Sequence, residues 1–149
     1  MIEGVVITPQ RVIPDERGMI KHMLKSDSPN FKQFGEIYFS FVYPGAVKAW
    51  HLHKIMTLNY AVPVGNIKFV LYDPRENSPT FGQIQEIYMG EANHCLVTVP
   101  PGIWNGFKGI GLATAVVANF TDIPHDPDEI IRCSPTDGTI AYDWNILMK

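Results

Sequence analysis

The sequence has little cysteine, and its two thiols lie far apart. Cys95 and Cys133 belong to no CxxC pair, so we expect reduced thiols rather than a disulfide framework or a cysteine metal site. Long hydrophobic runs are missing as well, since none approaches the roughly 20 apolar residues that cross a bilayer. The N-terminus also lacks the charged and apolar regions of a signal peptide. These absences predict a cytoplasmic protein with no membrane partner.

Charge is sparse too. Asp, Glu, Lys and Arg make up 18% of the 149 residues and give a formal net charge of −3. With no basic run, the chain lacks the electrostatic footprint of a nucleic-acid-binding surface. No internal repeat, low-complexity tract or linker divides it. We therefore predict a single domain over residues 1–149, large enough to bury a substantial core.

Turn residues between short apolar segments are abundant. The chain has twelve Gly and twelve Pro, and its runs rich in Val, Ile, Phe and Tyr predict strands without alternating helices. This pattern predicts an all-β sandwich or barrel, and a jelly-roll barrel with its site at the mouth fits best. One short turn or 3₁₀ segment is expected at 26–33, and one helical turn in an irregular tail near Trp144. The predicted strands are 4–12, 19–23, 37–42, 46–52, 57–62, 67–72, 83–89, 95–99, 104–109 and 112–119.

Two histidines two residues apart stand out in one predicted strand. His51 and His53 follow Gly45 with the spacing of a cupin first motif, which is a glycine, five residues and then His-x-His. Side chains at i and i+2 face the same side of a strand, so the two imidazoles should point together. Imidazole titrates near neutral pH and can either bind a metal or move a proton.

The other cupin ligand positions favour proton transfer. A metal-binding cupin also supplies a glutamate and a third histidine, but Leu58 stands at the glutamate position and Asn105 at the histidine position of Pro100-Pro101-Gly102-Ile103-Trp104-Asn105. Two neutral imidazoles alone rarely hold a divalent ion. We therefore predict no metal or other cofactor, acid–base work for the histidines, and a hydrogen-bonding role for Asn105 on the cavity wall.

Several further motifs resemble those of the dTDP-4-dehydrorhamnose 3,5-epimerases, which are metal-free cupins of the RmlC type. The similarity runs from about residue 15 to residue 144 and is most specific where Ser-Pro-Thr-Phe-Gly and Pro-x-Gly-x-x-x-Gly-Phe occur together. The matching segments are Asp15-Glu16-Arg17-Gly18, Lys48-Ala49-Trp50-His51, Asp73-Pro74-Arg75, Asn77-Ser78-Pro79-Thr80-Phe81-Gly82, Pro100-Pro101-Gly102-Ile103-Trp104-Asn105-Gly106-Phe107 and Trp144.

The resemblance implies a cupin double-stranded β-helix that acts on a nucleotide-diphospho-4-keto-6-deoxy sugar. A base removes a proton next to the ketone, an acid returns one on the opposite face, and no cofactor is needed because the ketone acidifies the proton. The resemblance also implies a homodimer in which N-terminal strands are exchanged, and residues 1–12 form an apolar arm suited to that role.

The resemblance assigns roles residue by residue. His51 takes the position of the base, and His125, in His125-Asp126-Pro127, takes that of the acid, which is usually a tyrosine. Ser134 stands where an aspartate orients the base, and Leu58 where a lysine faces the enolate.

Substrate contacts are expected from a second set of residues. Arg17 and Lys48 are assigned to the diphosphate, which guanidinium and ammonium groups bind well. Tyr38 and Trp104 are expected on the cavity wall, where an aromatic ring can stack on a base or sugar.

Two other functions stay open. His51-Leu52-His53-Lys54 with Tyr38 upstream is also similar to sugar 3,4-ketoisomerases, in which His53 would act beside His51. Because the family's lysine, tyrosine and aspartate positions are substituted here, a third hypothesis is a cupin that binds nucleotide sugars without catalysis.

Overall fold

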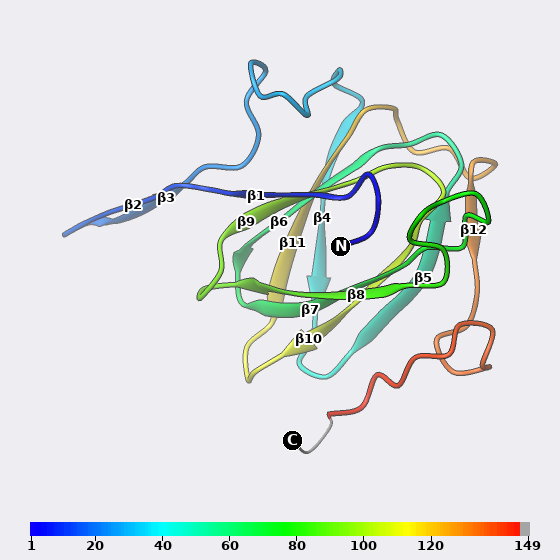
Figure 1. Ribbon diagram of the computed structural model, residues 1–149. Helices are drawn as coiled ribbons and strands as arrows, with labels where there is room; N and C mark the ends of the chain where they lie inside the picture. The colour runs from blue at the N-terminus through cyan, green and yellow to red at the C-terminus, as the bar shows by residue number, and fades with distance from the viewer. Residues whose placement is uncertain (147–149) are drawn as a thin grey trace.

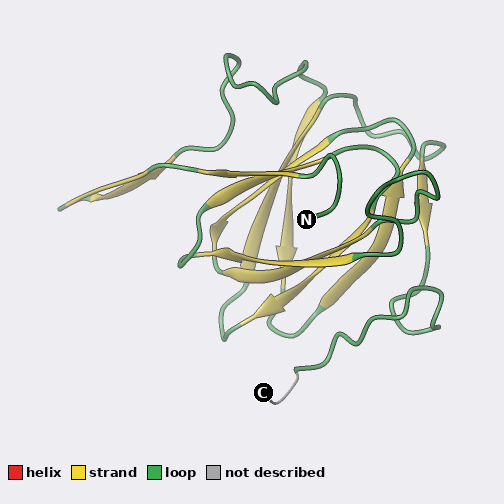
Figure 2. Ribbon diagram, viewed as in Figure 1, coloured by secondary structure: helices red, strands yellow, loops and turns green. Residues whose placement is uncertain are grey.

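The protein, described by a computed structural model over residues 1–146, is built of strands and loops (Figures 1 and 2). Two five-stranded antiparallel sheets face each other, with orders β1-β9-β6-β11-β4 and β12-β5-β10-β7-β8, and β2-β3 form a separate hairpin. The strands are β1 (Val6–Pro9), β2 (Val12–Asp15), β3 (Gly18–Lys21), β4 (Glu36–Val42), β5 (Val47–His53), β6 (Leu58–Val64), β7 (Asn66–Tyr72), β8 (Ile84–Gly90), β9 (Cys95–Val99), β10 (Trp104–Ile110), β11 (Ala115–Thr121) and β12 (Ile130–Arg132).

The main core lies between the two sheets. Strands in the middle of each sheet are buried on both faces, so β9 and most of β7 are continuously apolar or small, as buried strands usually are. Phe69, Leu71 and Val97 are fully buried there, together with Leu58 and Ile103. The all-β prediction is confirmed, and no helix in the described residues is long and apolar enough to span a membrane.

A second apolar cluster lies on the outer face of the β5-β10-β7 sheet. Trp50 is fully buried there beneath the C-terminal tail, with ring centroids 5.0 Å from those of Trp144. Ile140 and Tyr142 belong to the same cluster. The aromatic side chains thus hold the tail against the sheet, together with a hydrogen bond from Lys108 Nζ to the Trp144 carbonyl oxygen at 2.7 Å. The expected helical turn near Trp144 is absent from the described residues, and 26–33 forms turns without a 3₁₀ segment.

The strand predictions hold except at two places. The predicted strand 4–12 is two strands, because β1 pairs with β9 of the same chain while β2 turns away to pair with β3. The predicted arm 1–12 is thus partly used inside its own sheet, and the β2-β3 hairpin is what projects from the body (Figure 1). Strand β12 was not predicted, because three residues beside a Pro- and Asp-rich loop carry no periodic pattern.

The Asp-Pro-Arg and Ser-Pro-Thr motifs hold the β7-β8 loop. Asp73 is completely buried and accepts hydrogen bonds from Arg75 Nε at 2.8 Å, Ser78 Oγ at 2.6 Å and Thr80 Oγ1 at 2.6 Å. Burial alone would raise the pKa of Asp73, but these donors together hold it well below its usual value. The loop is therefore a structural element.

Both cysteines are unpaired, as predicted.

Candidate active site

A cavity of about 650 Å³ lies between the sheets at their β4-β11 and β5-β12 ends. Strand β4 contributes Glu36, Tyr38 and Ser40, while β5 contributes Lys48, His51 and His53. Strand β4 has an inverted pattern, because its polar side chains face the cavity while Ile37, Phe39 and Phe41 are exposed on the outside. A polar inner face lets the barrel hold a polar ligand where a core would otherwise be.

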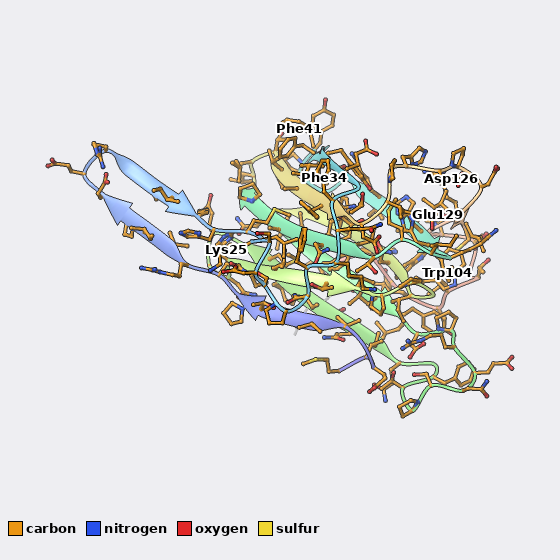
Figure 3. All side chains as sticks on the ribbon, turned by 90° about the horizontal axis from the view of Figure 1, so that it is seen from above. Lys25, Phe34, Phe41, Trp104, Asp126 and Glu129 are labelled. Carbon is orange, nitrogen blue, oxygen red and sulfur yellow. The ribbon has the colours of Figure 1, made fainter. Side chains whose placement is uncertain are left out.

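The two histidines of β5 line the same cavity, as the two-residue spacing predicts. Strand β12 pairs with β5 beside them, and places Arg132 opposite His51 and Ile130 opposite His53. The loop before β12 therefore lies next to both imidazoles. Figure 3 shows Asp126 and Glu129 of this loop at the end of the molecule away from the β2-β3 hairpin.

His51 has no carboxylate partner. Burial, followed by the positive charges of Arg132, His53 and Lys48, lowers its pKa to about 4. Its imidazole makes no hydrogen bond to any residue that the structure describes, and Ser134, at the family's aspartate position, instead bonds Thr136. His51 is thus neutral at pH 7, with a lone pair available to take a proton.

His53 has the carboxylate that His51 lacks. Its Nδ1 pairs with Glu129 Oε1, and the two side chains are only 6% and 3% exposed. Glu129 Oε2 accepts the backbone N–H groups of Ile55 and Met56, each at 3.1 Å. Burial raises the pKa of Glu129, but the bonds from His53 and the two N–H groups outweigh it and lower the pKa overall.

Sequence reasoning missed Glu129 and Arg132. Glu129 ends an acidic run, Asp126-Pro127-Asp128-Glu129, that has the composition of a solvated loop. Arg132 follows two isoleucines and belongs to no motif used in the prediction. Only the pairing of β12 with β5 brings either side chain to the histidines.

Three further predicted residues also reach the cavity. Lys48 Nζ donates to Ser40 Oγ and to the Phe41 carbonyl oxygen, both at 2.8 Å. The Tyr38 hydroxyl accepts from Asn119 Nδ2 at 2.8 Å, and burial nevertheless raises the pKa of Tyr38. His125 lines the cavity from the loop after β11, where its backbone N–H donates to Glu36 Oε1 at 2.9 Å.

Three predicted residues lie outside the cavity. Arg17 is at the turn of the β2-β3 hairpin, with an 85% exposed side chain paired to Asp15. Trp104 packs against the outer cluster around Trp50, because alternation on β10 turns it away from the cavity. Asn105 is buried and donates to the His51 carbonyl oxygen at 3.1 Å, so it braces β5.

The cavity combines neutral, cationic and acidic groups. Lys48 and Arg132 face it, and Glu36 is its acidic lining residue, since Glu129 is buried behind His53. Leu58 lies in the core, and the described residues hold no group of three His, Cys, Asp or Glu side chains placed to bind a metal. The arrangement can attract an anion and transfer protons beside it.

Known proteins resemble this chain along nearly its whole length. The whole chain, residues 1–149, matches the protein family described as dTDP-4-dehydrorhamnose 3,5-epimerase. It is 33% identical over 147 residues to the spore coat polysaccharide biosynthesis protein SpsL of Bacillus subtilis, covering 97% of each chain. It is 36% identical over 149 residues to the probable low-salt glycan biosynthesis epimerase Agl13 of Haloferax volcanii, covering 97% of this chain and 95% of the relative.

A solved structure is closely similar as well. The crystal structure of a dTDP sugar isomerase from Desulfovibrio desulfuricans G20 superposes with a TM-score of 0.93 and 48% identity, covering 96% of this chain and 92% of the other. Fold and sequence thus agree along nearly the whole length, and the cupin prediction is confirmed. The chain belongs to the dTDP-4-dehydrorhamnose 3,5-epimerase family of cupin carbohydrate epimerases.

Proposed function

We propose that this protein epimerises a nucleotide-diphospho-4-keto-6-deoxy sugar, with His51 as the base that removes the proton next to the ketone. The observation that carries the proposal is that the His51 imidazole lines a cavity together with Arg132 and Lys48, where burial and these charges lower its pKa. A general base must be unprotonated to work, and the two cations suit a diphosphate. Membership of the epimerase family supports the substrate class.

The reaction needs two proton transfers and no cofactor. The ketone acidifies the neighbouring C–H bond, His51 takes the proton, and the electron pair moves onto the ketone oxygen. A proton returned to the opposite face of the same carbon inverts it. His125 is the proposed acid, because it lines the cavity from a different segment than His51.

We also propose that the protein works as a homodimer. Phe39 and Phe41 are each 60% exposed on the outer face of β4, and Figure 3 shows the Phe41 ring pointing away from the body. The β2-β3 hairpin projects from the body (Figure 1), and its apolar residues Met19 and Ile20 are exposed. A second copy would cover both surfaces and would let Arg17 reach the diphosphate in the partner's cavity.

A 3,4-ketoisomerase is a second candidate, favoured by one observation. His53 lines the same cavity as His51 and is held by Glu129, so a second imidazole is available to return a proton at a neighbouring carbon.

The unpaired Cys95 and Cys133 suit the reducing cytoplasm that we propose as the location of either enzyme.

The test is incubation with dTDP-4-keto-6-deoxyglucose in D₂O, followed by NMR and mass analysis of the sugar. Deuterium at C3, or at C3 and C5, with inversion supports the epimerase, while migration of the ketone supports the ketoisomerase. His51→Ala should abolish exchange and leave the fold intact. Thermal stabilisation by the nucleotide sugar without any exchange would replace both proposals with a binding protein.

A further inference from the structure

Removal of a proton next to a ketone creates negative charge on the ketone oxygen, and this enolate needs a hydrogen-bond donor or cation nearby. The residue at the position of the family's lysine, Leu58, is 1% exposed within the core and offers neither. Lys48 is a lysine on the cavity wall, and its ammonium already donates to Ser40 and to the Phe41 carbonyl oxygen. Two of the three N–H donors of this ammonium are engaged in that way, so other groups on the cavity wall are candidate donors as well.

His53 has the geometry of such a donor. Its Nδ1 is occupied by Glu129, so Nε2 is the ring nitrogen left to face the cavity that His53 lines. Glu129 is itself fixed, because its second oxygen accepts two backbone N–H groups from Ile55 and Met56. A carboxylate held this way sets the orientation of the imidazole and compensates the charge when both ring nitrogens carry protons.

Resting on the proposed function, we propose that His53 is the catalytic group that donates Nε2–H to the ketone oxygen, and that Glu129 is the positioning residue that keeps His53 oriented and doubly protonated. The carboxylate–imidazole pair of this protein therefore serves the developing enolate rather than the base.

The step balances with His51 and His53 alone. The C–H bond next to the ketone breaks as an N–H bond forms on His51, and the C–H electron pair becomes the carbon–carbon double bond. The carbonyl π pair moves to oxygen, where it accepts the proton of His53 Nε2 as a hydrogen bond or as a full transfer. Return of a proton to the opposite face of the carbon reverses these movements.

Different surroundings separate the roles of the two histidines. His51 faces Arg132 and Lys48 and has no carboxylate, whereas His53 has Glu129 in contact. Two titratable groups in contrasting surroundings are typical of acid–base pairs. The other titratable groups facing this cavity are Glu36 and Tyr38 on β4, Tyr60 on β6 and His125 in the loop after β11.

The direct test compares Glu129→Gln with Asp128→Asn, which removes a neighbouring but exposed carboxylate. We expect Glu129→Gln to slow deuterium exchange next to the ketone roughly 100- to 1000-fold, the loss typical of an oxyanion donor, while dTDP binding by calorimetry is unchanged. The alkaline limb of its pH–rate profile should move to lower pH, because the charge that favours the doubly protonated ring is gone. Asp128→Asn should match the wild type in all three.

Two results of that comparison would overturn the proposal. Equal exchange rates in Glu129→Gln and Asp128→Asn would show that the carboxylate is not needed. A change confined to the acidic limb would show that His53 works as a neutral base.

A second measurement covers the case in which Glu129→Gln does not fold, and it needs no turnover. Nitrogen NMR of the wild-type protein bound to dTDP should show both ring nitrogens of His53 protonated at pH 7. A single protonated ring nitrogen would overturn the donor role. If the wild type exchanges no proton of the sugar, the proposed function fails, and this spectrum still decides the pairing of His53 with Glu129.

Discussion

Arg132 on β12 stands directly opposite His51 on β5. Burial lowers the pKa of His51, and the guanidinium charge adds to that effect, so that the value falls to about 4. A strand of three residues thus contributes to the protonation state of the proposed base. The same strand follows the loop that carries Glu129, so β12 arranges both histidines of the cavity.

Replacing Arg132 with Gln should change the pH dependence of exchange. The base works only when unprotonated, so in the wild type activity is lost as the pH falls through about 4. Without the nearby cation the pKa of His51 rises, and the acidic limb should move up toward 6.5. The pH profile of kcat for exchange measures this shift.

Lys54→Gln is the matched control for Arg132, because Lys54 follows β5 and its side chain is exposed. Its acidic limb should stay in place. An Arg132→Gln profile identical to that of the wild type would show that Arg132 does not act on His51.

The low pKa of His51 also predicts a pH-dependent stability. Between about pH 6.5 and 4 the unfolded chain binds a proton at His51 that the folded protein resists. Stability is therefore fully present above pH 6.5 and declines as the pH falls toward 4, by at most about 3 kcal/mol from this group. Urea unfolding at several pH values should show a smaller decline in His51→Asn, and an unchanged decline would contradict the prediction.

Asp73→Asn should destabilise the β7-β8 loop without touching the cavity. Asp73 is completely buried and receives hydrogen bonds from Arg75, Ser78 and Thr80, so the variant leaves a buried network incomplete. Leaving a buried polar network incomplete costs about 1 to 3 kcal/mol, and the partly exposed Arg75 keeps the loss below that of a fully buried ion pair. Chemical denaturation measures the loss, and the exposed Glu76→Gln should cost almost nothing. Equal stability of the two variants would argue against the network.

The proposed dimer predicts complementation between two inactive variants. Arg17→Ala lacks the residue that would enter the partner's cavity, and His51→Ala lacks the base. If Arg17 acts across the dimer, a refolded equal mixture should recover about a quarter of the wild-type activity, since half the dimers are mixed and each holds one complete site. No recovery in a mixture shown by light scattering to be dimeric would rule out the shared site.

Local sequence patterns were enough to predict most of the strands and the orientation of the two histidines. His51 and His53 share a face because strand side chains alternate with a period of two, and the structure brings both to the cavity. The motifs from Asp15 to Trp144 were enough to predict the family, because they span most of the chain. Those motifs fold locally, as the Asp73 network shows.

The contacts that distinguish one site residue from another depend on pairing between segments far apart in the chain. Glu129 lies 76 positions from His53 in the chain, yet it is the carboxylate that His53 contacts. Ser134, the residue expected to orient His51, instead accepts a hydrogen bond within its own turn. Trp104 and Asn105 end the Pro-Pro-Gly motif and were expected on the cavity wall. Instead, Trp104 packs against the outer cluster, and Asn105 donates to the backbone of β5.

Local sequence was sufficient to predict most of the strands and the chemistry that the chain carries, because strand alternation and turn propensity act over a few residues. The folded arrangement of the strands established which histidine has a carboxylate, which is kept neutral by burial and nearby cations, and that Arg17 lies outside its own cavity. Charge and burial act through space, so a pKa or an ion pair depends on strands that meet only after folding.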